Sequence, residues 1–239
     1  MTVFVFCGPT IHESEAKQIL TAEYLPPAAQ GDVLNAVARK PRAIGIIDGY
    51  FQFTPSVLHK EILWALDQGV HVFGSSSMGA LRAAELHSFG MKGVGRIFEK
   101  YREGLLTRDD EVALNHGPAE LKYPSLSEPL VNIRATLEVA SENKVISQET
   151  ADKLLKLMDQ EYFSNRSYKH MLHLGLQDNV QPDELLRLER WLESNTVNQK
   201  KIDAIEMLHS MDTFLRETPG PFTARFRLER TSIFDQLTS

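Results

Sequence analysis

The sequence lacks most features that mark secreted, membrane-spanning or metal-stabilised proteins. It contains a single cysteine, Cys7, which excludes an intramolecular disulfide and every zinc-finger spacing. No apolar run approaches the roughly 18 residues that a membrane-spanning helix needs. The N-terminus also lacks the basic-then-apolar order of a signal peptide. We therefore expect a cytoplasmic protein.

A large excess of positive charge is also missing. The formal net charge is −6, which gives no general attraction to nucleic acid or to an anionic membrane, so we expect neither as a partner. The content of 42% hydrophobic and 24% charged residues is ordinary for a globular protein. With 239 residues, the chain can bury a full core as one large domain or two modest ones.

The first half of the chain alternates between two kinds of pattern. Short apolar or β-branched runs predict strands at residues 2–6, 43–48 and 70–73, with a short one at 23–25. Helix-favouring stretches separate them, at residues 12–20, 31–40, 54–68 and 78–87, the third opened by Thr54-Pro55. This alternation implies right-handed crossovers and a parallel sheet. We predict an α/β domain over residues 1–124, with about four parallel strands and flanking helices, Rossmann-like or flavodoxin-like.

The second half changes character, because no convincing strand follows residue 128. Helical periodicity occurs at residues 130–140, 147–162, 167–174, 182–192 and 198–215. We predict an all-helical region over 125–217 that either docks a macromolecule or forms a homodimer. Periodicity is lost from Thr218-Pro219-Gly220-Pro221 onward, which predicts a flexible tail over 218–239.

Three predicted strands are followed by chemically rich loops. In an open parallel sheet, ligands bind outside the carboxyl ends of the strands. The three loops, which should meet at this edge, are Cys7-Gly8-Pro9-Thr10, Asp48-Gly49-Tyr50-Phe51 and Gly74-Ser75-Ser76-Ser77-Met78-Gly79.

The serine loop, residues 75–77, is open to three interpretations. Its sequence fits small-x-nucleophile-x-small with Ser77 as the nucleophile, the pattern of a sharp strand-to-helix turn. Ser77 would then lie at a helix N-terminus, where unpaired N–H groups stabilise negative charge. The same loop can instead cradle a phosphate or carboxylate, or can simply cap a helix.

A nucleophilic serine needs a base, and His59 is the first candidate. It lies about one turn into the predicted helix, roughly 6 Å from its start, which keeps it near the carboxyl edge of the sheet. The alternative is that His59 simply belongs to a solvated face of this helix. Asp48 ends an apolar strand, so its carboxylate needs a specific partner or caps the following turn. Arg82 and Glu85 are three residues apart and can pair with each other. Cys7 fits a small core residue better than a nucleophile.

Two further kinds of site are disfavoured. Asp109, Asp110, Glu111 and His116 lie close together in sequence, but no second histidine stands at ligand spacing, so we expect a solvated loop and no bound metal. No G-x-x-x-x-G-K-[ST] is present, and residues 8–10 are too short for a dinucleotide fingerprint. A nucleotide-binding module is therefore the weakest interpretation, and we expect no cofactor.

Several segments resemble the TfuA-like core domain, over roughly residues 1–140. They are GPT (8–10), IGIIDGYF (44–51), HKEILWALDQGVHVFGSSSMGALRAAEL (59–86), GMKGVGRIFEKYREG (90–104) and DDEVALNHGPAE (109–120). The resemblance implies a partner of a YcaO protein, the enzyme that activates a peptide amide with ATP. It also implies a backbone thioamide as the product and a thiocarboxylated ubiquitin-like carrier protein as the sulfur source, with the precursor peptide as a further partner.

Releasing sulfide from a thiocarboxylate is acyl transfer to water, which needs a nucleophile, a base and oxyanion donors. In this scheme Ser77 attacks, His59 takes its proton, and Glu61 or Asp48 orients the base. Remaining groups bind the substrate, through backbone N–H groups or side chains of Gly8, Thr10, Lys60, Ser76, Met78, Gly79 and Arg82. Second choices for a role are Cys7, Glu85 and His116. The competing hypothesis is a non-catalytic adaptor that brings the sulfur source or the precursor peptide to YcaO.

Overall fold

The computed structural model describes residues 2–51, 54–218 and 220–229. The chain forms two compact units. The sheet unit comprises Met1–Thr107 together with Lys201–Ser239, and the helical unit comprises Arg108–Lys200. These units divide the chain differently from the ranges 1–124, 125–217 and 218–239, because the last part of the chain returns to the sheet unit. Among the described residues, no helix combines the length and the apolar character needed to cross a membrane.

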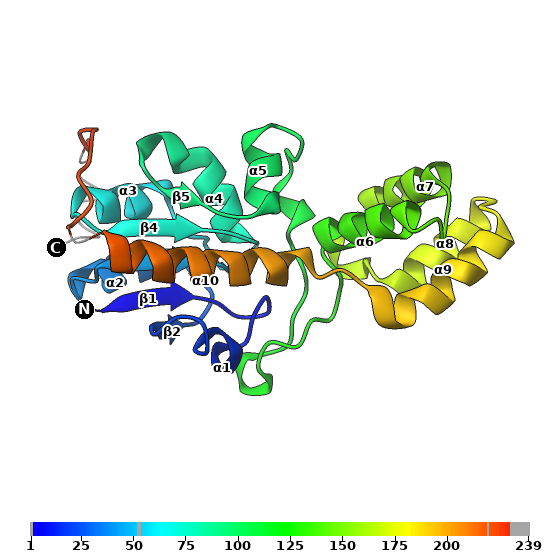
Figure 1. Cartoon of the computed structure of the whole chain (residues 1–239), viewed down its shortest axis with the longest axis horizontal. Helices are drawn as coiled ribbons and strands as arrows, with labels where there is room; N and C mark the ends of the chain where they lie inside the picture. Colours follow the sequence, from blue (N-terminus) through cyan, green and yellow to red (C-terminus); the bar gives the residue numbers. More distant parts are fainter. Residues whose placement is uncertain (1, 52–53, 219, 230–239) are drawn as a thin grey trace. The chain divides into compact units, whose positions relative to one another are not determined.

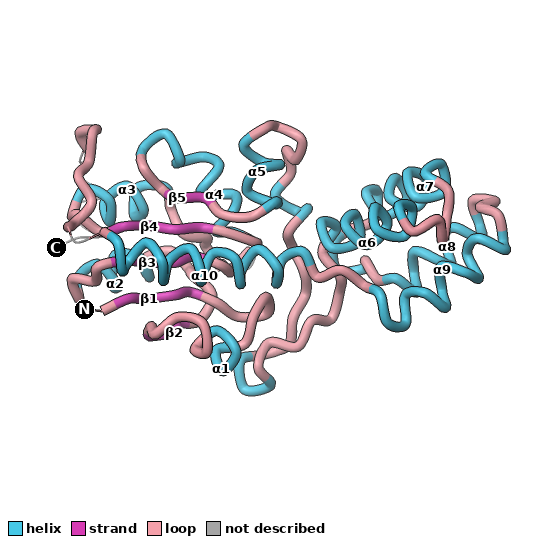
Figure 2. The backbone as a smooth tube through the Cα atoms, viewed as in Figure 1, coloured by secondary structure: helices cyan, strands magenta, loops and turns pink. Residues whose placement is uncertain are grey.

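The sheet unit is built on five parallel strands in the order β2-β1-β3-β4-β5. Their bounds are β1 Val3–Phe6, β2 Glu23–Leu25, β3 Ala43–Ile46, β4 His71–Gly74 and β5 Lys92–Gly93. The three central strands, β1, β3 and β4, are buried at every position, as expected for strands covered on both faces. The predicted α/β fold is confirmed, with β5 as a fifth strand that the sequence analysis missed (Figure 2).

Five α-helices of the sheet unit lie between consecutive strands or directly after β5. Their bounds are α1 Glu13–Ala16, α2 Asp32–Ala38, α3 His59–Asp67, α4 Met78–Leu86 and α5 Arg96–Arg102, with a short 3-10 turn at His87–Phe89. Helix α3 begins at His59 and not at Pro55, which corrects the predicted start. The reason is that the segment before it pairs with the loop after β2: Gln30 N–H donates to the Pro55 carbonyl at 2.9 Å, and Ser56 bridges to Ala29.

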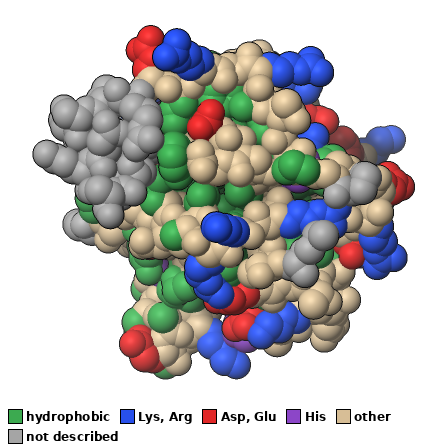
Figure 3. Space-filling view, turned by 90° about the vertical axis from the view of Figure 1, so that its left-hand side faces the viewer, with side chains coloured by type: hydrophobic (Ala, Val, Ile, Leu, Met, Phe, Trp, Pro, Cys, Tyr) green, Lys and Arg blue, Asp and Glu red, His purple; other side chains and the backbone are tan. Residues whose placement is uncertain are grey.

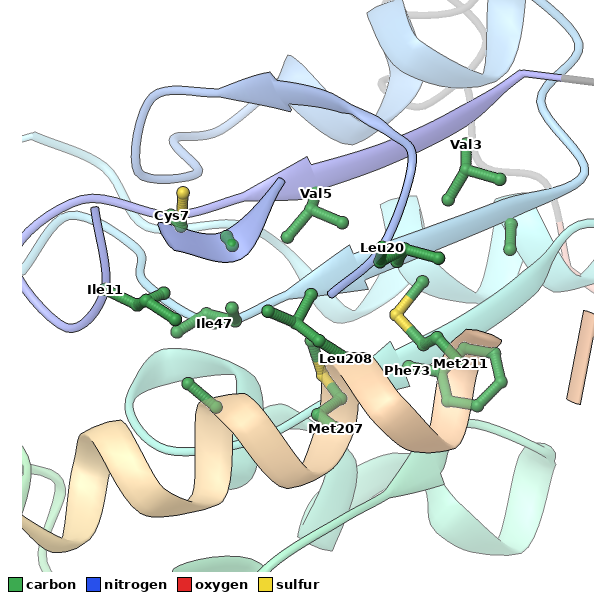
Figure 4. Packing of buried hydrophobic residues seen from close by; sticks show 13 residues of the cluster. Val3, Val5, Cys7, Ile11, Leu20, Ile47, Phe73, Met207, Leu208 and Met211 are labelled. Atoms are coloured by element: carbon green, nitrogen blue, oxygen red, sulfur yellow. The ribbon is translucent and has the colours of Figure 1, made fainter. Parts of the chain in front are cut away.

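Helix α10, Gln199–Glu217, packs against one face of the sheet, although its sequence periodicity groups it with the helical region. Figure 4 shows Met207, Leu208 and Met211 directed at side chains of the strands. Gly45 of β3 makes room for them, because a Cβ there would lie 2.9 Å from the Met211 sulfur. Figure 1 shows the helix in front of the sheet, running alongside the strands between β1 and β4.

A buried carboxylate ties α10 to the helix after β5. Asp203 is fully buried, and its Oδ2 accepts a hydrogen bond from Ile97 N–H at 2.8 Å. Gly95, which precedes α5 and has φ +96°, has no room for a side chain: a Cβ would lie 2.4 Å from the Asp203 Cγ. The aspartate therefore satisfies an N-terminal N–H of α5 and fixes α10 against it.

The helical unit contains four longer helices, and the predicted helical region is confirmed (Figure 1). They are α6 Leu130–Glu142, α7 Gln148–Gln160, α8 Tyr168–Gln177 and α9 Pro182–Asn195, with 3-10 turns at Asp109–Glu111, Ala119–Leu121 and Phe163–Asn165. Ser147 caps α7 by accepting from Thr150 N–H at 3.2 Å, as its position in the sequence indicates. Leu137, Leu154 and Leu188 belong to the unit's own hydrophobic core.

The last described segment lies along the edge where the strands begin. Phe222 N–H donates to the Gly69 carbonyl at 2.8 Å, and His71 Nε2 lies 3.0 Å from the Gly220 carbonyl. Figure 3 looks onto this edge and shows a band of hydrophobic side chains with Lys, Arg, Asp and Glu around it. Of the predicted tail over 218–239, residues 219 and 230–239 lie outside the described residues.

Candidate functional site

The candidate site lies at the carboxyl edge of the sheet, where the strand order reverses. From β1 the chain passes to β2 on one side, and from β3 it passes to β4 on the other. In sheets with this order, the crevice at the switch point between β1 and β3 is the usual ligand position. The loops that follow β1, β3 and β4 are the three loops singled out in the sequence.

Asp48 joins the first two of these loops. Its side chain is buried, and Oδ2 accepts from Gly8 N–H at 2.9 Å and from Thr10 N–H at 3.0 Å. Its Oδ1 accepts from the Thr10 hydroxyl at 2.5 Å. Three hydrogen bonds to one carboxylate hold the β1 loop in a fixed shape. We call Asp48, Gly8 and Thr10 the switch-point clamp.

The β3 loop also touches the start of α4. A Cβ on Gly49 would lie 2.8 Å from the Met78 Cγ, so only glycine allows this contact. Gly79 N–H donates to the Ile47 carbonyl at 3.3 Å. The three loops therefore meet at one edge.

The loop after β2 joins the same edge, which the sequence analysis missed. Ala28 N–H donates to the Asp48 carbonyl at 2.9 Å, and Tyr50 N–H donates to the Ala28 carbonyl at 3.0 Å. The only signal in the sequence is the turn at Pro26-Pro27, which does not reveal the pairing that follows.

The serine loop is a strained, sharp strand-to-helix turn. Ser76 has φ +66°, in the left-handed region that a serine rarely adopts. Gly74 and Gly79 on either side allow the close approach, since a Cβ on Gly79 would lie 1.7 Å from the Ile46 carbonyl oxygen. The backbone turn is similar to that of a nucleophile elbow, with Ser76 at the strained position, but the Ser76 side chain is buried.

The three serines have different surroundings. Ser75 and Ser76 are fully buried, and their hydroxyl oxygens lie 3.0 Å apart. Ser77, the predicted nucleophile, has 8% of its surface exposed and stands at the N-cap of α4, where its side chain makes no capping hydrogen bond. Helix α4 begins directly after the three serines in the chain, so the partial positive charge of its N-terminus is close to them.

His59, the predicted base, pairs with Glu85. Its Nε2 lies 2.7 Å from Glu85 Oε2, which also accepts from Arg82 at 2.6 Å. Arg82 Nε donates in addition to the Val57 carbonyl at 3.1 Å. Glu85 is eight residues beyond Ser77, about 12 Å along the helix axis at roughly 1.5 Å per residue. The structure therefore brings His59, Arg82 and Glu85 together near the end of α4, and not at its start.

Glu61 has a different task from orienting the base. It is fully buried, and it accepts from Gly31 N–H at 2.9 Å and from Leu58 N–H at 3.1 Å. Burial raises the pKa of Glu61, while hydrogen bonds from backbone N–H groups act in the opposite direction. The side chain thus caps the starts of α2 and α3 together.

The remaining candidates are distributed as follows. Lys60, half-buried, is the second residue of α3. Cys7 is buried in the core beneath α10, and burial, with Asp48 as the second cause, raises the pKa of its thiol to about 12, so it stays protonated. His116 belongs to the helical unit, where its Nδ1 lies 2.8 Å from the Gly117 carbonyl.

Two of the acidic residues near His116, Asp110 and Glu111, form ion pairs. Asp110 pairs with Arg166 at 2.7 Å and with Arg108 at 3.0 Å, and Glu111 pairs with Arg134 at 3.0 Å. Within the part of the chain that the structure describes, no group of three His, Cys, Asp or Glu side chains could hold a metal ion.

Comparison with known proteins assigns the family. A family model described as TfuA-like protein matches residues 48–167, which is 120 of the 239 residues. The match starts later and ends later than the expected range 1–140, so it leaves out the β1 loop and includes α6 and α7. No curated protein matches the chain. The chain belongs to the TfuA-like family.

Proposed function

We propose that this chain is the sulfur-delivery component of YcaO-dependent peptide backbone thioamidation, and that it releases sulfide from a thiocarboxylated ubiquitin-like carrier at the serine loop. Membership of the TfuA-like family suggests a role associated with thioamidation. The observation that best supports chemistry at this loop is the strained φ of Ser76 between Gly74 and Gly79, at the carboxyl edge of the sheet. Backbone strain at such a position is typical of nucleophilic turns.

In the proposed reaction, the Ser76 hydroxyl oxygen attacks the thiocarboxylate carbon. A C–O bond forms, the C–S bond breaks, and the hydroxyl proton leaves with sulfur as HS⁻. Water then hydrolyses the acyl-serine to the carboxylate and a proton, which restores the hydroxyl. In this step the thiocarboxylate sulfur accepts the serine proton and so acts as the base, a role that the sequence prediction gave to His59, which pairs with Glu85.

We propose Ser76 as the nucleophile in place of the predicted Ser77 because of its strained φ, although Ser76 is fully buried and Ser77 is 8% exposed. The start of α4 offers a partial positive charge to the anionic thiocarboxylate. The N–H groups of Gly8 and Gly79 already donate within the protein, to Asp48 and to the Ile47 carbonyl. We therefore propose the N–H of Met78, and not those of the two glycines, as the oxyanion donor.

The test is a sulfide-release assay with the purified chain and a thiocarboxylated carrier. We expect Ser76→Gly, which suits the positive φ and removes only the hydroxyl, to lower the release rate by about a hundredfold or more. Ser77→Ala, the matched control, should stay within a few fold of wild type. Full activity of Ser76→Gly would refute the mechanism.

The adaptor hypothesis is the second candidate, because several predicted catalytic groups have structural tasks: Asp48 and Glu61 bind backbone N–H groups, and His59 pairs with Glu85. The two hypotheses differ when free sulfide is supplied to a reaction with YcaO and the precursor peptide. Added sulfide should restore thioamidation by Ser76→Gly if that variant fails only in sulfide release. A defect that added sulfide does not restore would instead support the adaptor role.

A further inference from the structure

The helical unit contains a groove between α8 and α9, with a volume of about 740 Å³. It is separate from the serine loop in the chain and plays no part in the proposed chemistry. The groove is lined by leucines of both helices and by the charged side chains of Lys169, Asp183, Glu189 and Glu193.

The apolar residues of the groove repeat at helical spacing along both walls. Leu172 and Leu176 are four apart on α8, and Leu185 and Leu186 stand on α9 with Leu192 two turns further. Leu176 is 58% exposed and Leu186 is 49% exposed, so the groove is open at the end near the turn between α8 and α9, whereas Leu185 and Leu192 are buried and form its floor. A small-molecule pocket encloses most of its ligand, which this trough does not do. With ten residues, α8 gives it a length of about 15 Å, enough for roughly ten residues of a helix.

The two walls carry different charges. Glu189 and Glu193 stand four apart on exposed positions of α9, on one side of the groove. Within the described ranges, neither glutamate has an ion-pair partner. The α8 wall carries Lys169 and His173. We call Glu189 and Glu193 the acidic rail.

From this arrangement we infer that the groove binds an amphipathic helix of a partner protein, with an apolar stripe flanked by Arg or Lys on the side that faces α9. The leucines bury the stripe, and the acidic rail fixes its rotation, as in other helix-in-groove complexes. The lining holds three acids against one lysine. A second copy of this chain would repeat that acidic excess, whereas a basic helix neutralises it.

The experiment uses the full chain and a fluorescent 14-residue peptide with leucines spaced three and four apart and arginines along one flank. A matched peptide carries glutamates in place of the arginines. Fluorescence anisotropy should show binding of the arginine peptide, with the glutamate peptide about tenfold weaker or more. Leu186→Glu should weaken binding of the arginine peptide by about tenfold or more. Leu121→Glu, at an exposed position outside the groove, should leave it unchanged.

Charge reversal gives the decisive arm. The double variant Glu189→Lys/Glu193→Lys should prefer the glutamate peptide. The inference is overturned if the arginine peptide fails to bind, if Leu186→Glu binds as wild type does, or if charge reversal leaves the preference unchanged. It is also overturned if the free chain forms a dimer that Leu186→Glu dissociates, since a second copy would then occupy the groove. None of these results depends on sulfide release.

Discussion

The switch-point clamp makes a quantitative prediction about Asp48. Replacing it by alanine removes three hydrogen bonds and leaves the N–H groups of Gly8 and Thr10 in buried surroundings without their acceptor. Each stranded group costs about 1–3 kcal/mol, so we expect Asp48→Ala to lower the free energy of unfolding of the sheet unit by about 3–5 kcal/mol. In Asp48→Asn, the amide oxygen still accepts from both N–H groups, so the expected loss is about 1–2 kcal/mol.

The measurement can be confined to the sheet unit. In a Trp191→Phe background, Trp64 of α3 is the sole tryptophan, and its fluorescence reports urea unfolding of that unit. Hydrogen exchange at the Gly8 and Thr10 amides reports the clamp directly and should accelerate in Asp48→Ala. Asp67→Ala, at an exposed position, is the control and should change stability by less than about 0.5 kcal/mol. A loss below about 1 kcal/mol for Asp48→Ala, with unchanged exchange, would refute the clamp.

Three further predictions concern the core and the caps of the sheet unit. Because burial raises the pKa of Cys7 to about 12, a disulfide reagent at about pH 8 should modify the thiol only after unfolding, and stoichiometric labelling of the folded chain would contradict this. Burial also raises the pKa of Glu61 above its ordinary value of 4.5, so the stability it contributes is present below that value and is lost as pH rises through the raised one. Measured by urea unfolding, the stability of wild type relative to Glu61→Gln should therefore fall from about pH 4 to about pH 7, and a rise would show that the direction is wrong. Gly45→Ala should lower the free energy of unfolding by about 1–3 kcal/mol, because the new methyl group crowds Met211. The double variant Gly45→Ala/Met211→Ala should lose less stability than the sum of the two single variants, and strictly additive losses would show that the two residues do not interact.

Local patterns explain how much of the fold could be predicted. The apolar runs of β1, β3 and β4 identify strands buried on both faces, and the spacing between them implies parallel pairing. β5 consists only of Lys92 and Gly93, too few residues for any periodicity. The sequence of α10 indicates which face of the helix is apolar, but the periodicity does not indicate which element packs against that face.

The candidate site was predictable in place but not in detail. Loops at the carboxyl ends of parallel strands must share an edge, so their positions follow from the strand order. Hydrogen-bond partners depend on distances that the sequence does not contain, which is why Glu61 was paired with His59 while the structure pairs Glu85 with it. The positive φ of Ser76 likewise has no signature in three consecutive serines.

The sheet unit is formed by two segments that are separated in the chain, and this has a consequence for folding during synthesis. Residues 108–198 emerge before α10 does, so during synthesis one side of the sheet, including Val5 and Phe73, has no cover until residues 199–217 appear. The four-helix segment, whose core is its own, can fold first as a unit. Chains that end before α10 would expose the apolar face of the sheet to solvent, so we expect such fragments to bind chaperones and to aggregate.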